Sequence, residues 1–84
     1  MRTPEITMYG ADWCSDCTRA KSVLESHDVA FEYINLVESP EKAGAAQAIS
    51  GRTSIPVITF PDGSYLVEPS NGDLESKLRE VGVL

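Results

Sequence analysis

Two cysteines lie three positions apart near the start of the chain, in the segment Trp13-Cys14-Ser15-Asp16-Cys17. Two thiols at this spacing can close a small disulfide, and such a pair beside a β-α-β pattern is typical of redox proteins. No other cysteine occurs in the 84 residues, so none is left to build a disulfide framework. A disulfide across so short a loop removes little entropy from the unfolded chain, which makes stabilisation a poor reason for the pair. The spacing predicts thiol–disulfide exchange.

Two other interpretations of the cysteine pair stay open. The thiols could be reduced residues of the hydrophobic core, or they could form half of a metal site. Zinc takes four ligands in structural sites, and His27 is the only histidine, so one chain offers too few ligands for zinc. His27 ends a predicted helix, where the helix dipole stabilises a cation. We therefore interpret it as a helix-end residue rather than a catalytic base.

Cys14 is predicted to be the nucleophile because it lies where a helix begins. The unpaired N–H groups and the dipole at a helix N-terminus favour an anion, and the thiolate is the nucleophilic form of cysteine. Cys17 would lie one turn into the helix, more buried and suited to resolving a mixed disulfide. Charged neighbours are expected to tune the thiolate. Arg19 and Lys21 would add positive field, and Asp16 would oppose a second negative charge.

Trp13 and Pro56 each allow two interpretations. Trp13 could fill the core, but beside a reactive and therefore accessible cysteine we expect it to be exposed and to form a flat wall next to the sulfur. Pro56 could simply mark a strand at the sheet edge. Alternatively, a cis Ile55–Pro56 bond, which is rare enough to be a deliberate feature, would aim the Ile55 backbone groups toward the cysteines to pair with a peptide-like thiol.

Hydrophobic periodicity and turn signals predict an α/β chain with the element order β-α-β-α-β-β-α. The predicted strands cover residues 5–9, 31–36, 55–60 and 65–67, with turns at Gly10 and at residues 61–64. The first predicted helix shows apolar helical spacing over residues 17–27, with Cys14 at or just before its start. The second covers residues 39 to about 49, and in the last Leu74, Leu78 and Val81 form the buried stripe. A βαβ unit followed by a hairpin gives a four-stranded mixed sheet with three helices on its faces.

Helix ends and packing faces can also be predicted. Ser39 and Ser70 are expected to cap the second and third helices, with Pro40 in the first turn of one and Asp73 completing a capping box in the other. Small side chains in the second helix suit close packing on a sheet. They are Ala43, Ala45, Ala46 and Ala48.

The formal net charge of −6 argues against nucleic acid or an anionic membrane as partner, because both need a basic surface. No charged-then-apolar signal segment opens the chain, and no apolar run approaches the length of a membrane span. No linker, repeat or low-complexity stretch divides it, so residues 1–84 are expected to form one domain. We expect a monomer that resides in the cytoplasm, where disulfides are usually transient and catalytic.

Motifs along nearly the whole chain resemble the glutaredoxin family. They are residues 9–17, Ser54-Ile55-Pro56, Asp62-Gly63 and Pro69-Ser70. Within the family the likeness is closest to the short actinobacterial mycoredoxins, which pair a Trp-Cys-x-x-Cys site with a following Arg-x-Lys. The resemblance implies a thioredoxin fold, a cis proline at Pro56, Cys14 as nucleophile and Cys17 as resolving thiol. It also implies reduction of mixed disulfides between proteins and a low-molecular-weight thiol, with no metal and no tightly bound cofactor.

Departures from the family pattern bear on which thiol is used. Ala11 stands where members that use glutathione carry a lysine, Ser15-Asp16 replaces Pro-Tyr or Gly-Tyr, and residues 67–70 replace a segment containing Gly-Gly. Mycothiol ends in an uncharged sugar–inositol unit, which needs no cation, so the expected co-substrate is mycothiol rather than glutathione. The residues expected to contact the thiol substrate are Asp12, Trp13, Ser54, Ile55, Pro56, Glu68, Pro69, Ser70 and Asn71.

Two alternative functions stay open. The chain could be a carrier that holds an iron–sulfur cluster or a metal ion through Cys14 in a dimer, as some glutaredoxins do. It could also be a general dithiol glutaredoxin reduced by glutathione or by thioredoxin reductase. The C-terminal Trp-Ser-Gly-Phe-Arg-Pro signature of glutaredoxin-like donors to ribonucleotide reductase is absent from the sequence, which makes that role a weaker expectation.

Overall fold

The computed structural model describes residues 6–82, and the predicted strand start at Glu5 lies outside that range. Four strands and three α-helices alternate in the predicted order, with one short 3₁₀ helix between β2 and α2. The strands are β1 (Thr7–Gly10), β2 (Glu32–Asn35), β3 (Val57–Thr59) and β4 (Tyr65–Val67), and the helices are α1 (Ser15–Ser26), η1 (Pro40–Lys42), α2 (Ala43–Ser50) and α3 (Asn71–Glu80).

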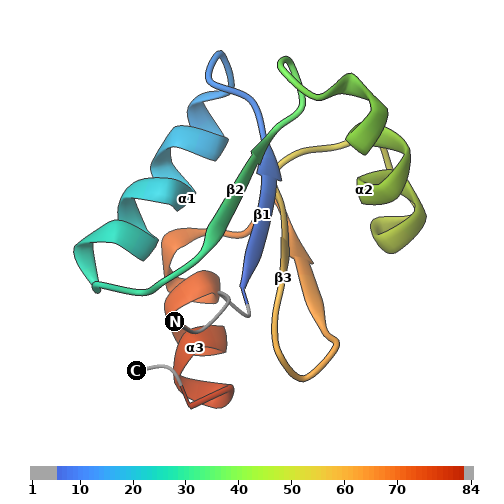
Figure 1. The fold of residues 1–84 in the computed structure, drawn as a ribbon. Coiled ribbons are helices and arrows are strands. Elements are labelled where there is room, and N and C mark those ends of the chain that lie inside the picture. The colour runs from blue at the N-terminus through green and yellow to red at the C-terminus, as the bar shows by residue number, and fades with distance from the viewer. Residues whose placement is uncertain (1–5, 83–84) are drawn as a thin grey trace.

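The strands form one mixed sheet in the order β2-β1-β3-β4. β1 and β2 are parallel, whereas β1 with β3 and β3 with β4 are antiparallel. Helices α1 and α3 lie together on one side of the sheet and α2 lies on the other (Figure 1). The predicted four-stranded mixed sheet with three α-helices is therefore confirmed. The segment between β1 and α1, which contains Cys14, lies beyond the end of the parallel pair, and Cys17 lies in the first turn of α1 (Figure 1).

The main core fills the space between the sheet and the α1–α3 pair. Met8 and Ile58 lie opposite each other on β1 and β3 and are both fully buried. Leu24 of α1 and the two leucines of α3, Leu74 and Leu78, meet them and are equally buried. The leucine spacing of four residues places both α3 side chains on one helix face. This packing fixes the helix that begins at the cysteines against the centre of the sheet.

The second helix differs from its prediction at its start and in its packing. Ser39 precedes it as expected but makes no side-chain capping hydrogen bond, and the Lys42 N–H bonds to the Ser39 carbonyl at 2.9 Å in a tighter 3₁₀ turn. The α-helix itself begins only at Ala43. Ala46 is buried, whereas Ala43, Ala45 and Ala48 are exposed. The prediction of four packed alanines was wrong, because an eight-residue helix presents only a narrow strip to the sheet.

Smaller shifts occur at other element ends. The first helix begins at Ser15, directly after Cys14 as predicted, and the third strand begins at Val57 because Pro56 has no N–H to donate to a sheet. The predicted Ser70 cap is present, with its hydroxyl oxygen accepting from the Asp73 N–H at 3.1 Å. His27 is the C-cap of α1, as expected for a helix-end residue, and its Nε2 lies 2.8 Å from a Glu75 carboxylate oxygen of α3.

Candidate redox site

Cys14 is the N-cap residue of α1. Its backbone is extended, with φ −88° and ψ 114°, and its Sγ accepts a hydrogen bond from the Cys17 N–H at 3.3 Å. An N-cap side chain normally uses an oxygen to satisfy one of the unpaired N–H groups of the first turn. Here a sulfur takes that place. The Cys14 sulfur thus lies at the end of the helix where the unpaired N–H groups and the positive end of the helix dipole are found.

Cys17 lies behind Cys14 in the core. Its side chain is 1 % exposed, whereas Cys14 is half-buried, and both residues are unbridged thiols. Burial is the main reason that the pKa of the Cys17 thiol rises from 9.0 to about 12, and the hydrogen bond with Cys14 raises it further. The two thiols therefore differ in access to solvent. The geometry allows an outside sulfur to reach Cys14 first, with Cys17 held next to it.

Gly10 makes room for the Cys17 sulfur. A Cβ atom at Gly10 would lie 2.9 Å from Cys17 Sγ and 3.4 Å from a ring carbon of Tyr33. The sequence predicted a turn at Gly10, but this residue is the last of β1 and pairs with Asn35 of β2. A glycine inside a strand often marks such a close approach, and that signal could have identified the position.

Gly10→Ala is expected to lower the free energy of unfolding by about 1–3 kcal/mol, the usual cost of overpacking a filled core. Gly44→Ala is the matched control. A Cβ at Gly44 meets no atom within 4 Å, and replacing glycine in a helix by alanine is stabilising by roughly 0.5–1 kcal/mol. Urea denaturation of the reduced proteins would measure both changes. Equal effects of the two substitutions would contradict the packing described for Gly10.

The two cations that follow the cysteines are engaged by other groups. Arg19 Nη2 lies 3.4 Å from a carboxylate oxygen of Asp16 and donates to the Pro69 carbonyl at 3.1 Å. Lys21 Nζ lies 4.5 Å from the centre of the Tyr33 ring, which is a cation–π contact. The structure thus brings Arg19 and Asp16 together beside the redox motif and directs Lys21 toward β2.

Asp12 anchors the segment before Cys14 to β2. Its two carboxylate oxygens accept hydrogen bonds from the Tyr33 hydroxyl at 3.0 Å and from Asn35 Nδ2 at 3.2 Å. Burial, and then the hydrogen bond to Asp12, raises the pKa of Tyr33 above its ordinary value of 10.0. Sequence reasoning placed Asp12 at the substrate and missed both partners. Tyr33 and Asn35 are two positions apart on a strand and so share one sheet face, which was the signal available.

The other residues expected at the substrate are Trp13 and those of two later segments, of which Ile55 packs against the same core as Cys14. Trp13, at 75 % exposure, is the accessible aromatic residue that was expected there. The Ile55–Pro56 bond is cis, Ile55 is half-buried, and Pro56 is fully buried. The Pro56 carbonyl accepts from the Glu68 N–H at 3.0 Å. Through that bond the segment 54–56 is joined to residues 68–71.

The third part of the expected substrate site is the loop between β4 and α3. Glu68 has a left-handed backbone, with φ +49°, and its side chain is exposed. Pro69 is buried, Ser70 caps α3, and Asn71 is the first residue of that helix and exposed. All nine residues expected to contact a thiol thus lie on the segments 12–13, 54–56 and 68–71. Hydrogen bonds connect residues 68–71 to Pro56 and to α1, and they connect Asp12 to β2.

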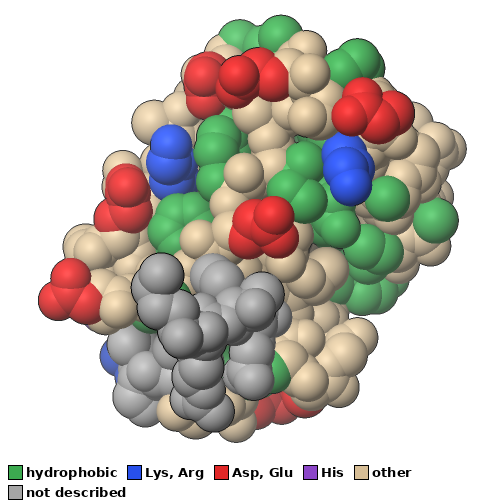
Figure 2. Space-filling view, viewed as in Figure 1, with side chains coloured by type: hydrophobic (Ala, Val, Ile, Leu, Met, Phe, Trp, Pro, Cys, Tyr) green, Lys and Arg blue, Asp and Glu red, His purple; other side chains and the backbone are tan. Residues whose placement is uncertain are grey.

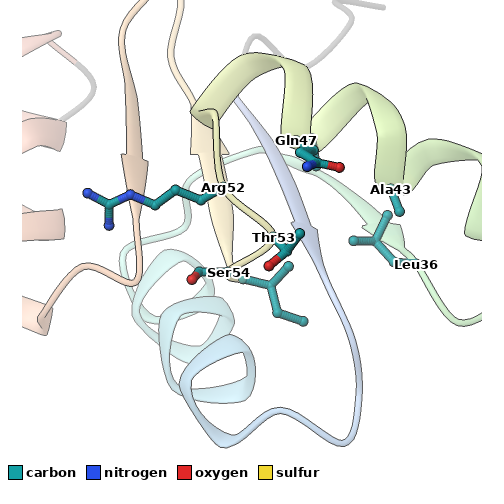
Figure 3. Close-up of a pocket in the computed structure, with 8 residues that line it drawn as sticks. Leu36, Ala43, Gln47, Arg52, Thr53 and Ser54 are labelled. Atoms are coloured by element: carbon teal, nitrogen blue, oxygen red, sulfur yellow. The ribbon is translucent and has the colours of Figure 1, made fainter.

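A small cavity of about 80 Å³ opens between α2 and the segment that precedes Pro56 (Figure 3). It is lined by Leu36, Ala43, Ala46, Gln47 and residues 52–55. The Arg52 side chain extends away from the wall that Leu36 and Ala43 form (Figure 3). Of the residues expected at the substrate, Ser54 and Ile55 border this cavity.

Within residues 6–82, no helix has the length and apolar character needed to cross a membrane. Over the same part of the chain, no three His, Cys, Asp or Glu side chains are grouped so that they could hold a metal ion.

Comparisons with known proteins agree with this geometry. The glutaredoxin family profile matches residues 6–66. A Mycobacterium tuberculosis protein named as a glutaredoxin is 28% identical over 82 residues, which cover 96% of this chain and 98% of the relative. The structure of a glutaredoxin from Archaeoglobus fulgidus superposes with a TM-score of 0.81 at 27% identity, covering 92% of this chain and 88% of that one. The glutaredoxin-like NrdH-redoxin from Escherichia coli gives 0.73 at 28% identity, covering 84% and 91%. Because the family profile covers most of the chain, including both cysteines, this protein belongs to the glutaredoxin family of thiol–disulfide oxidoreductases.

Proposed function

We propose that this glutaredoxin reduces mixed disulfides between proteins and a low-molecular-weight thiol, with Cys14 as the attacking thiolate and Cys17 as the resolving thiol. The observation that carries the proposal is the difference between the two sulfurs. Cys14 caps a helix and is accessible, whereas Cys17 is buried with a raised pKa. Glutaredoxins use a small thiol as co-substrate, and the joined segments around Cys14 offer a surface for one.

The reaction follows from these positions. The Cys14 thiolate attacks the small-thiol sulfur of a mixed disulfide, a new S–S bond forms, and the target protein leaves as a thiolate that takes up a proton. Cys17 then loses its proton and attacks Cys14 Sγ, which expels the small thiol and closes the Cys14–Cys17 disulfide. Two further molecules of small thiol supply the two electrons that restore both cysteines, and they leave as their own disulfide.

The charges near the site favour an uncharged thiol such as mycothiol. Glutathione carries two carboxylates, but Ala11 is buried and offers no cation, while Asp12 and Glu68 add negative charge on the two sides of the proposed groove. Acidic side chains are also spread over the face seen in Figure 2, in keeping with the net charge of −6. An anionic thiol meets an unfavourable field there.

The same surface offers contacts that a sugar can use. The Ser70 hydroxyl and the Asn71 amide are exposed, and the open face of Trp13 could stack on a sugar ring. Tyr33 and Asn35 hold the Asp12 carboxylate in place, while each of its oxygens keeps a further lone pair for a hydroxyl donor.

Mycothiol mixed disulfides are therefore expected to be reduced with a higher kcat/KM than glutathione mixed disulfides, by about tenfold if two unfavourable charge contacts are relieved. Two NADPH-coupled assays on one preparation, each thiol with its own disulfide reductase, would measure the ratio. Glu68→Gln is the matched variant, and it should raise kcat/KM for glutathione more than for mycothiol. Equal or better turnover with glutathione in the unmodified protein would contradict the mycothiol assignment.

A further inference from the structure

We propose that Arg19 is a positioning residue that ties the 68–71 loop to the first turn of the redox helix and thereby sets the affinity for the small thiol. This inference rests on the proposed function. The Arg19 guanidinium joins parts of the chain that are 50 positions apart, donating to the Pro69 carbonyl at 3.1 Å. The same Nη2 nitrogen lies 3.4 Å from Asp16, the residue beside Cys17 in the motif.

The 68–71 loop needs contacts to keep its shape. Glu68 has φ +49°, a left-handed conformation that costs energy for any residue with a Cβ and persists only where neighbouring contacts hold it. On one side, the Glu68 N–H donates to the Pro56 carbonyl at 3.0 Å. On the other side, the Arg19 guanidinium binds the Pro69 carbonyl. Within residues 6–82, this is the single side-chain hydrogen bond between α1 and the loop.

Asp16 helps to aim the guanidinium rather than to stabilise the fold. Both side chains are nearly half exposed, at 44% and 47%, and ion pairs of that kind contribute little to stability. A carboxylate on the preceding helical turn does, however, limit the rotamers that Arg19 can adopt. Lys21 cannot take over this role because its ammonium lies over the Tyr33 ring on the β2 side. Arg19 therefore links the redox motif to the opposite wall of the proposed groove.

A tie of this kind predicts separable effects on binding and on thiol chemistry. Without the guanidinium, the loop samples positions in which it no longer meets a bound thiol, so KM rises. Attack by Cys14 on a reagent too small to touch the loop stays unchanged. If Arg19 acted instead by its positive charge on the Cys14 thiolate, the reaction with the small reagent would slow and KM would stay the same.

The test compares Arg19→Ala with Arg79→Ala, which removes an exposed arginine from the last turn of α3. Arg19→Ala is expected to raise KM for the mixed disulfide about tenfold, the effect of losing one charge-assisted hydrogen bond. The rate at which iodoacetamide alkylates Cys14 in this variant should stay within about twofold of the rate in the unmodified protein, because the substitution removes only one exposed ion pair. Amide hydrogen exchange at Glu68 should become about tenfold faster by the same hydrogen-bond argument. Arg79→Ala should change neither KM, nor the alkylation rate, nor the exchange rate at Glu68.

Unchanged exchange at Glu68 in Arg19→Ala would overturn the tie, whatever the activity. An unchanged KM, or alkylation slowed in proportion to kcat/KM, would overturn the link to thiol affinity. Arg19→Gln, which keeps an N–H donor but no charge, should fall between Arg19→Ala and the unmodified protein in both KM and exchange rate. If the unmodified protein reduces no mixed disulfide, the proposed function is refuted. The hydrogen-exchange comparison would still show whether Arg19 holds the 68–71 loop.

Discussion

Cys14→Ser is expected to lose at least about a thousandfold in disulfide reductase activity, because a serine hydroxyl is not ionised at neutral pH and cannot start the exchange. Rapid alkylation at pH 7 should disappear with it. The remaining Cys17 thiol is 1 % exposed, and its raised pKa keeps it protonated. Initial rates with a protein mixed disulfide and iodoacetamide labelling followed by peptide mass analysis would measure both effects.

Cys17→Ser is the matched control for that loss, since it removes the other sulfur from the same motif. It should keep the first step and either accumulate the mixed disulfide at Cys14 or turn over slowly with a second small thiol. Labelling of Cys17 that is as fast as labelling of Cys14 in the unmodified protein would contradict the division of labour between the two thiols.

The reduced protein is also expected to lose stability in alkaline solution through Cys17. The unfolded chain releases the Cys17 proton near pH 9.0, whereas the folded protein keeps it up to about pH 12. This contribution to stability is thus fully present below pH 9 and is lost as the pH rises toward 12, because the folded state binds more protons in that window. At pH 10.5 the expected loss is on the order of 2 kcal/mol relative to pH 7.

Urea denaturation under reducing conditions at pH 7 and at pH 10.5 would measure this loss. Cys17→Ala removes the titrating thiol and should show a smaller decrease between the two pH values. Part of the decrease should remain, because burial and the Asp12 hydrogen bond raise the pKa of Tyr33 and act in the same direction. An equal decrease with and without the Cys17 thiol would show that its burial does not contribute.

The order of strands and helices could be read from local patterns. Alternating strands, a proline- and glycine-containing turn at residues 61–64, and the Leu74–Leu78 spacing are signals that lie within single elements. The apolar pattern marks α1 only from Cys17 onward, because Ser15 and Asp16 have no apolar side chain to extend it. A cysteine as N-cap lies outside the usual set of capping residues as well.

The contacts that shape the site depend on residues that are distant in sequence. Arg19 meets Pro69, and Asp12 meets Tyr33 and Asn35, only once the sheet and α1 are assembled. The need for glycine at position 10 arises in the same way, from a sulfur seven residues later. Local pattern therefore pointed to the candidate cysteines, whereas the positions of the residues around them required the structure.

The most direct test of this account is to trap the mixed disulfide. Reduced Cys17→Ser protein would be mixed with a symmetric disulfide of the small thiol, quenched with acid, digested and sequenced by mass spectrometry. We predict one adduct per chain on Cys14, released by added small thiol. In the unmodified protein treated in the same way, the same adduct should give way to a Cys14–Cys17 disulfide. No adduct on Cys14 in Cys17→Ser, or an adduct on Cys17 in the unmodified protein, would contradict the assignment of Cys14 as the attacking thiol.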